Sequence, residues 1–393
     1  MSTIGDFGLI ADPFAITVGE LSVHKWAGRE REKELLLDVV ESVRSSDIGS
    51  SEFVVVHGDY GAGKSHALRY LTTLINEDEV ERFKGKAIYV QTVRVSQKIT
   101  FVDVYRTLID QLGRDFFSTL AAHVNVQVNS AATAYLQSLS HIEASSLMAD
   151  RSLLVSRTLG QHVPPSLTPF IHLLLKAANG GLVDVWRYLR GEKLSFPDIG
   201  LNSSLDADYP AVATLAGLFK VMTSDIGNER AAYEAVYLFV DEQENLVEMK
   251  AVESIQLLQS FRELLNQLPN YFCMIWGFSA DAALIEAVLP TPILQRLTRK
   301  YIELPALEPE AAKKFVREQL SGFRKPEFIA PSLYYPFSEA AVDAVLERIV
   351  EMTPRNIFKL MRAVLERAVR KHGLEPPNAI SGDLANSILD LQT

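Results

Sequence analysis

One short segment of this chain carries the residue types that bind a triphosphate. Residues 58–65 match the pattern G-x-x-x-x-G-K-[ST] at every fixed position. In this pattern the glycines let backbone N–H groups turn toward the β-phosphate, while Lys64 reaches the β- and γ-phosphates and the Ser65 hydroxyl binds Mg²⁺. We therefore expect one continuous run of residues to contact the nucleotide: Gly58, Asp59, Tyr60, Gly61, Ala62, Gly63, Lys64, Ser65 and His66.

The elements predicted on either side of this segment favour a functional loop over a chance match. An apolar, β-rich run at 53–57 precedes the loop, and residues 64–76 place apolar side chains on one helical stripe. A helix that starts at Lys64 directs its positive end at the phosphates. An accidental match in a chain of this length is expected on the order of once in a hundred, and a match between a strand and a helix is rarer still.

A second motif supplies two carboxylates. Residues 236–240 form an apolar run that ends at Asp241 and Glu242. The carboxyl ends of buried parallel strands are where open α/β sheets bind ligands. We expect Asp241 to hold Mg²⁺ and Glu242 to act as the general base that polarises the attacking water. Taken alone, the motif also fits a solvated acidic turn, and the next pair, Glu244 and Glu248, is best interpreted as an exposed helix start.

A polar residue and two cations follow the next apolar run, at 271–276. Ser279 is predicted to hold the lytic water, with Asp281 behind it, although a helix N-cap for residues 280–288 explains these residues equally well. Arg296 and Arg299 fit an arginine finger that stabilises charge on the γ-phosphoryl group of a neighbouring subunit. They fit a cationic helix end equally well, and the sequence does not decide which of the two is the finger.

A third cation is placed where a helix disfavours it. Thr353 is a good N-cap and Pro354 suits the first helical position, so Arg355 falls in the first turn of the helix that follows. A cation there opposes the helix dipole. This locally unfavourable charge indicates a function, and we expect Arg355 to sense phosphate.

The elements that must position these residues alternate between strands and helices, which predicts a parallel sheet covered on both faces. Apolar runs predict strands near 53–57, 87–90, 236–240, 271–276 and 301–304. Residues from about 120 to 230 break this alternation with helical patterns alone, and the pattern after Pro305 is helical to the end. The insertion is too long for a simple connector, so we expect it to recognise a partner.

Composition excludes several classes of protein. The 393 residues carry a net charge of −10 and no basic tail, so nothing predicts a chain that coats nucleic acid by itself. The single cysteine, Cys273, suits a reducing compartment. We find no signal-peptide pattern, no apolar run of about 20 residues that could span a bilayer, and no zinc spacing. We therefore expect a cytoplasmic protein that does not engage a membrane.

In this order the motifs resemble those of AAA+ ATPases: Walker A at 58–65, Walker B at 236–242, sensor 1 near Ser279, candidate fingers Arg296 and Arg299, and sensor 2 at Arg355. The leader, with Asp12-Pro13-Phe14 and Ala27-Gly28-Arg29-Glu30, resembles the adenine-side segment of the initiator-type group, which includes origin-recognition, Cdc6-like and TnsC-like proteins. The motifs at 58–66, 186–192 and 240–242 are also similar to ATP-binding proteins of BREX-like anti-phage islands.

This resemblance implies a P-loop AAA+ parallel-sheet ATPase core at 29–119 and 231–305. It also implies an N-terminal adenine-side linker at 1–28, an all-helical insertion at 120–230 and a C-terminal helical lid at 306–393. ATP and Mg²⁺ are the implied cofactors, and the implied partners are further copies of the chain, a partner protein and DNA. One departure is that about twenty residues follow the lid helices, too few for the winged-helix domain of the initiators. An ATP-gated scaffold or signalling switch with slow hydrolysis remains the alternative to a turnover ATPase.

Overall fold

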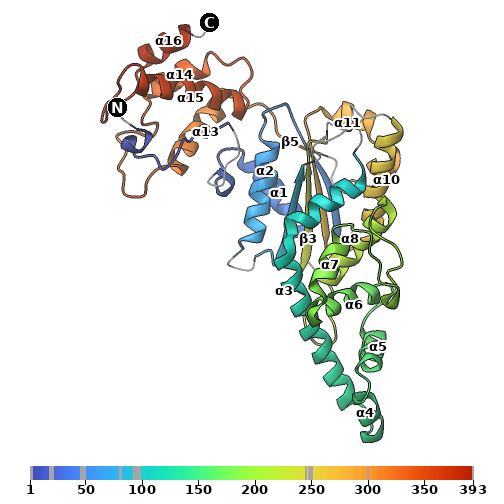
Figure 1. Cartoon of the computed structure of the whole chain (residues 1–393). Coiled ribbons are helices and arrows are strands. Elements are labelled where there is room, and N and C mark those ends of the chain that lie inside the picture. Colours follow the sequence, from blue (N-terminus) through green and yellow to red (C-terminus); the bar gives the residue numbers. More distant parts are fainter. Residues whose placement is uncertain are drawn as a thin grey trace.

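A five-stranded parallel sheet forms the centre of the molecule (Figure 1). The computed structural model describes residues 3–16, 22–44, 50–78, 82–91, 99–243, 246, 251–298 and 301–391. The strands are β1 (Ser51–His57), β2 (Gly85–Gln91), β3 (Ala235–Asp241), β4 (Phe272–Phe278) and β5 (Tyr301–Glu303), in the order β2-β3-β4-β1-β5. All five strands were predicted from the sequence, and the predicted fold class is confirmed.

Helices cover both faces of this sheet because successive side chains of a strand point to opposite sides. Val54 and Val56 of β1 pack with α1 (Glu30–Ser42) and α2 (Lys64–Asn76). Phe53 and Val55 face the other side and pack with α3 (Phe101–Gln137), α8 (Asp208–Met222) and α10 (Ala251–Gln267). All seven residues of β3 and all seven of β4 are buried, as expected for the central strands of a parallel sheet.

The described residues between β2 and β3 are helical, as predicted. After α3, which is interrupted at Gly113 (φ 76°, ψ 162°), the chain forms α4 (His141–Met148), α5 (Arg151–His162), α6 (Thr168–Lys176) and a π-helical turn, η3 (Ala177–Gly181). It continues through α7 (Leu182–Leu189), the short 3₁₀ helix η4 (Pro197–Ile199) and α8. The start expected for the insertion, near residue 120, lies inside α3.

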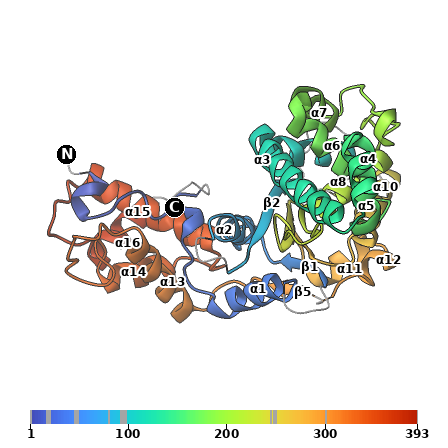
Figure 2. The ribbon, with the colours of Figure 1, turned by 90° about the horizontal axis from the view of Figure 1, so that it is seen from below.

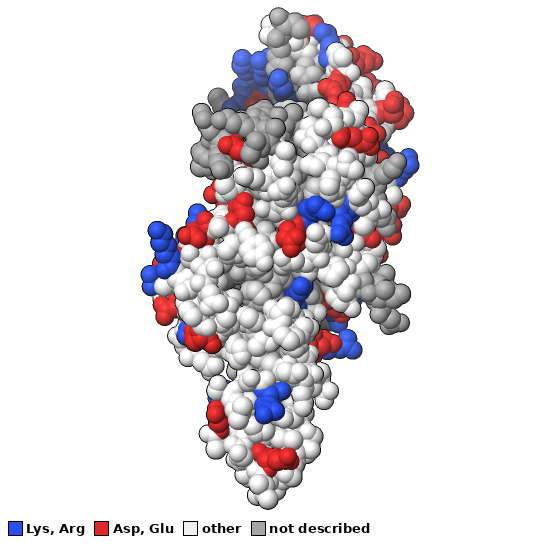
Figure 3. Space-filling view, turned by 90° about the vertical axis from the view of Figure 1, so that its right-hand side faces the viewer, with Lys and Arg blue, Asp and Glu red and all other residues white. Residues whose placement is uncertain are grey.

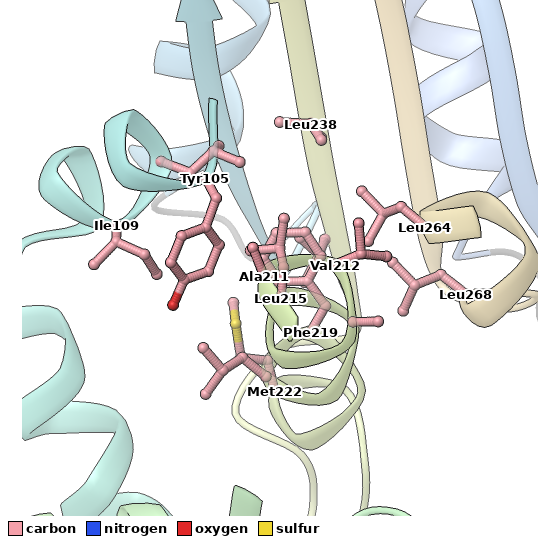
Figure 4. Close-up of a cluster of buried hydrophobic side chains, with 14 of the residues drawn as sticks. Tyr105, Ile109, Ala211, Val212, Leu215, Phe219, Met222, Leu238, Leu264 and Leu268 are labelled. Atoms are coloured by element: carbon pink, nitrogen blue, oxygen red, sulfur yellow. The ribbon is translucent and has the colours of Figure 1, made fainter. Parts of the chain in front are cut away.

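The root of the insertion shares one hydrophobic core with the sheet. Figure 4 shows Leu215 and Phe219 of α8 lying between Tyr105 of α3 and Leu264 of α10, below Leu238 of β3. The far end of the insertion differs, because α4 buries none of its residues. In Figure 3 this tapered end shows mainly uncharged side chains. The root therefore packs as part of the core around the sheet, and α4 lies at the projecting tip.

The last four helices form a second body with its own core. They are α13 (Pro309–Gly322), α14 (Glu339–Leu346), α15 (Pro354–Arg370) and α16 (Gly382–Asp390). The leader, with two short 3₁₀ helices, η1 (Ile4–Phe7) and η2 (Ser22–His24), joins this lid: Phe7, Leu9 and Phe14 are buried among the lid's apolar side chains. None of the helices in the described residues combines the length and apolar character that crossing a bilayer requires.

Candidate functional site: a nucleotide cavity between core and lid

The loop between β1 and α2 has the backbone that the sequence pattern predicts. Gly58 has φ 149° and Gly61 has φ 88°, a region that favours glycine. Space is also tight, since a Cβ atom on Gly58 would lie 2.4 Å from the Leu304 carbonyl oxygen and one on Gly61 would lie 2.6 Å from the Arg355 Cβ. The loop leads directly into α2, which begins at Lys64 as predicted. Its glycines thus allow both the turn and the close approach of the lid.

Lys64 is buried and directed back into the loop. Its Nζ donates hydrogen bonds to the carbonyl oxygens of Gly58, at 2.8 Å, and Asp59, at 2.9 Å. Carbonyl oxygens carry only partial negative charge, so the ammonium retains most of its capacity to balance an anion. Gly58 and Asp59 therefore position the lysine, whereas residues from Tyr60 to Ala67 line the cavity itself.

The acidic pair follows β3 in the predicted way. Asp241 is only 2% exposed. Its Oδ2 accepts a hydrogen bond of 2.7 Å from the Tyr89 hydroxyl, and its Oδ1 accepts one of 2.9 Å from the Glu242 N–H. Burial and the neighbouring Asp241 raise the pKa of Tyr89, so its hydroxyl stays protonated and remains a donor. These contacts fix the Asp241 carboxylate beside the phosphate loop.

Glu242 has an unusual backbone conformation for a residue other than glycine, with φ 60°. The Gln243 N–H donates to the Gly277 carbonyl oxygen at 3.0 Å, which ties the turn to neighbouring β4. The Glu242 Oε1 accepts a hydrogen bond of 3.4 Å from the Gln91 Nε2 at the end of β2. Residues from three adjacent strands therefore position the predicted base.

The cavity between core and lid brings most of the predicted residues together. It has a volume of about 250 Å³, and Lys64, Ser65, Asp241, Glu242, Ser279 and Arg355 all line it. Asp281 does not line the cavity: it is the N-cap of α11 (Ala282–Val288), where its side chain accepts a hydrogen bond of 2.7 Å from the Leu284 N–H. The N-cap explanation therefore applies to Asp281, while the role of Ser279 in holding the lytic water stays a prediction.

Arg355 extends from the first turn of α15 onto the phosphate loop. Thr353 caps the helix as predicted, its Oγ1 accepting a hydrogen bond of 3.3 Å from the Asn356 N–H. The Arg355 guanidinium lies 4.3 Å from the centre of the Tyr60 ring, and the backbone N–H of Arg355 donates to the Gly61 carbonyl oxygen at 3.3 Å. The cation is therefore held at the phosphate end of the cavity, although its action as a sensor remains a prediction.

One of the predicted finger residues, Arg296, stands apart from this cavity. Arg296 is exposed, does not line the cavity and donates to the Oδ1 of Asn266. It follows α12 (Thr291–Leu294), which Figure 2 places on the side of the core away from the lid. Arg299, Glu244 and Glu248 lie outside the described residues. An exposed arginine on the far face fits action on another subunit, and this role also remains a prediction.

Sequence reasoning missed the part of Arg29. Its guanidinium lines the cavity and donates to the carbonyl oxygens of Ala62, in the phosphate loop, and Pro305, where the chain enters the lid. Burial lowers the pKa of Arg29 to about 10, so the side chain is still charged at neutral pH. The available signal was the Gly28-Arg29-Glu30 segment, which the sequence linked to the adenine side only.

The other end of the cavity is largely apolar. Phe315 of α13 and Phe358 of α15 stack at 5.5 Å with an interplanar angle of 17°, and both line the cavity beside Ala27. His66 joins this end to the loop, since its Nε2–H donates to the Ser22 carbonyl oxygen at 3.0 Å and burial lowers its pKa. An apolar, aromatic lining next to a phosphate loop suits a nucleotide base.

The oxygen donors fit a magnesium ion that arrives with the nucleotide. The Ser65 hydroxyl and the Asp241 carboxylate both line the cavity, and hard cations prefer such oxygen ligands. In the described part of the chain, no group of three or more His, Cys, Asp or Glu residues could hold a metal by itself. Magnesium sites of this kind take one or two protein ligands and complete their shell with phosphates and water.

The strand order and the cavity beneath a helical lid define a nucleoside triphosphatase of the AAA+ class. Residues 25–275 match the family model described as the AAA ATPase domain, which covers more than half of the 393 residues. The chain therefore belongs to the AAA ATPase family and is an ATPase.

Solved structures with a similar fold come from archaeal initiators. The Aeropyrum pernix ORC2 protein, in ADPNP–ADP complexes, is 10% identical, with a TM-score of 0.52 over 94% of this chain and 71% of that one. The A. pernix ORC1 protein in complex with DNA is 13% identical (TM-score 0.49; 96% and 68%), and Cdc6p from Pyrobaculum aerophilum is 12% identical (TM-score 0.45; 93% and 67%). Among curated proteins, no similar sequence was found.

Proposed function

We propose that this chain binds ATP and Mg²⁺ between its core and lid, hydrolyses ATP as part of an oligomer and thereby drives or gates a partner that handles DNA. The observation that carries the proposal is the single cavity where Lys64, Asp241, Glu242 and Arg355 meet. These residues come from both the core and the lid, so a bound triphosphate would contact both bodies. Its hydrolysis would alter how they are held together.

The chemistry follows from what each side chain can do. Lys64 balances the β- and γ-phosphate charge, and the Glu242 carboxylate accepts a proton from the attacking water. Ser279 lies in the same cavity and orients that water, while Arg355 meets the γ-phosphate from the lid. When bound, Mg²⁺ would neutralise negative charge on the phosphates. Ser65 and Asp241 are the residues that would hold it.

Two further observations support the oligomer and the DNA partner in this proposal. The exposed position of Arg296, away from the chain's own cavity, suits a finger that completes the site of a second copy. The order of motifs resembles the initiator-type group, and the fold is similar to that of the A. pernix ORC2 protein, solved with ADPNP and ADP. The net charge of −10 gives no support of its own to DNA binding. A role in anti-phage defence rests only on the likeness to proteins of BREX-like islands.

The tip of the helical insertion is the surface we propose for the partner protein. Ile142 is 83% exposed and Met148 is 69% exposed, and both belong to α4, which buries none of its residues. A helix of eight residues gains little stability from its own hydrogen bonds. A partner that covers this apolar surface would supply the packing that the chain itself does not.

One contact favours the alternative, an ATP-gated scaffold that hydrolyses slowly. The Glu242 carboxylate accepts a hydrogen bond from Gln91 at 3.4 Å, and a donor to the ionised carboxylate makes it a weaker acceptor of the water's proton. A single-turnover experiment, set beside steady-state hydrolysis with and without DNA, separates the two functions. A turnover ATPase stimulated by DNA gives repeated cycles, whereas a scaffold gives one slow turnover followed by product retention.

The same assay tests the partner surface when it includes a chain in which residues 141–162 are replaced by a short linker. This change removes α4 and α5 and leaves the buried helix α8 in place. We expect ATP binding and basal hydrolysis to persist while biological activity is lost. Loss of nucleotide binding in a folded variant would instead make the tip part of the nucleotide site.

A further inference from the structure

A buried amide side chain lines the apolar end of the cavity. Gln319 is 8% exposed and lies one helical turn after Phe315 on α13, so both side chains occupy the same face of the helix. Both line the cavity. A polar group in an otherwise apolar slot requires a hydrogen-bond partner for each of its atoms.

The orientation of this amide is fixed by its neighbour. The Gln319 Nε2 donates a hydrogen bond of 2.7 Å to the Pro13 carbonyl oxygen. A carbonyl oxygen only accepts hydrogen bonds, so the amide nitrogen must face Pro13 and the amide oxygen must face away from it. Within the described residues, no group donates a hydrogen bond to the Gln319 Oε1. This oxygen is an acceptor available to a donor in the cavity that Gln319 lines.

Pro13 is itself held in place, which keeps the amide from turning over. Asp12 forms an ion pair with Arg362 of α15 at 3.1 Å, and its Oδ1 accepts a hydrogen bond of 2.9 Å from the Phe14 N–H. Phe14 is fully buried and packs edge-to-face on Phe358 at 5.8 Å. The leader therefore anchors the amide nitrogen from the side of the lid core.

The two ends of the cavity are ordered along α15. Arg355 and Phe358 are three residues apart and share one face of the helix. Arg355 lies on Tyr60 of the phosphate loop, while Phe358 stacks on Phe315, one turn before Gln319. A nucleotide whose phosphates occupy the loop thus places its base beside the two phenylalanines and within reach of Gln319.

We propose that Gln319 reads the base of the nucleotide, with its Oε1 accepting a hydrogen bond from the 6-amino group of adenine. This inference rests on the proposed nucleotide-binding function. Guanine carries a carbonyl oxygen at the same ring position, so two acceptors would face each other and the Oε1 would gain no hydrogen bond from the base. The aromatic pair contributes stacking for any purine, and Gln319 supplies the discrimination between them.

Direct binding to the full-length protein tests this assignment with three triphosphates. Purine riboside triphosphate lacks the 6-amino group and should bind about tenfold more weakly than ATP. GTP should bind about a hundredfold more weakly, because it opposes one acceptor with another. If the wild-type protein binds ATP and purine riboside triphosphate equally, the assignment is overturned while nucleotide binding stands. If it binds neither, the proposed function fails and the assignment fails with it.

Two variants distinguish recognition of the base by Gln319 from the contacts that hold the leader in place. Gln319→Leu removes the acceptor and should bring the ratio of the affinities for ATP and purine riboside triphosphate close to one. Glu318→Ala is the matched control, because Glu318 accepts a hydrogen bond of 2.6 Å from the Gly28 N–H but does not line the cavity. It loosens the leader and should leave the ratio unchanged even if both affinities fall. A ratio that survives in Gln319→Leu, or that collapses in Glu318→Ala, contradicts the proposal.

Discussion

The phosphate end and the base end of the cavity are built in different ways. The phosphate end comes mainly from one continuous run, residues 58–66, whose glycines and helix start set the geometry locally. The base end is assembled from the leader, α13 and α15, which lie far apart in the sequence. A local backbone motif therefore holds the phosphates, whereas the folding of the leader onto the lid creates the slot for the base.

This difference has a consequence for what each end contributes. The phosphate end offers charge, through Lys64 and Arg355, and charged hydrogen bonds contribute more than neutral ones. The base end offers an apolar slot and one unpaired acceptor, which contribute less affinity and more selectivity. We expect substitutions at the phosphate end to remove ATP binding or hydrolysis. Substitutions at the base end should change which purine nucleotide the protein prefers.

The largest effect on ATP affinity should come from Lys64→Ala. The change removes the buried ammonium that balances the β- and γ-phosphates, so ATP affinity should fall about a hundredfold. Titration of a fluorescent ATP analogue measures this fall. Lys314→Ala, on α13 and outside the cavity, is the matched control and should bind normally. Unchanged ATP affinity in Lys64→Ala would contradict the assignment of this end of the cavity to the phosphates.

A large effect on hydrolysis alone, with ATP affinity unchanged, is expected at the site of a second subunit. Arg296→Ala should bind ATP normally and hydrolyse it about a thousandfold more slowly, because the finger stabilises charge only in the transition state. Mixing Arg296→Ala with Glu242→Gln subunits should restore part of the activity, since some sites then carry both intact halves. Arg299→Ala deserves the same test. No recovery in either mixture, with rates independent of protein concentration, would indicate a monomeric ATPase.

Arg355→Ala should have a smaller effect that tests whether the lid senses phosphate. The arginine lies over Tyr60 at the phosphate end, so its loss should weaken ATP binding about tenfold and ADP binding less. Comparing the two affinities by calorimetry measures the preference for the triphosphate. Arg370→Ala, at the exposed end of the same helix, should leave this preference intact. An unchanged preference in Arg355→Ala would assign the residue a structural role only.

The smallest effect is expected at His66, where the two ends join. Burial lowers its pKa below the ordinary 6.5, so the unfolded chain binds more protons at this residue in mildly acidic solution. The free energy of unfolding should therefore fall as pH drops below about 6.5 and continue to fall through the folded-state pKa. Urea unfolding at two pH values should show a smaller fall for His66→Gln than for the wild type. An equal fall in the wild type and His66→Gln would refute the lowered pKa of His66 in the folded protein.

The contrast between the ends also explains what the sequence could reveal. The helix predicted at 64–76 has the observed bounds, and the phosphate loop was found because its chemistry depends on local backbone geometry. Gln319 and Arg29 escaped notice because their roles depend on contacts with Pro13 and Pro305, which only tertiary folding creates. The expected insertion boundary near 120 falls inside α3 because the part of this helix that follows the interruption at Gly113 continues past residue 120. The spacing of apolar residues along a helix does not show where the helix leaves the core and enters the insertion.

The claim that Glu242 is the catalytic base of an ATPase is tested most directly by Glu242→Gln. Binding of ATP and its hydrolysis in a single turnover should be measured on the same preparation. Because the amide cannot accept the proton of the attacking water, we predict an ATP affinity within about twofold of the wild type and hydrolysis slowed by about a hundredfold or more. Hydrolysis at the wild-type rate in Glu242→Gln would contradict the account, and Glu244 would then be the first residue to test as the base.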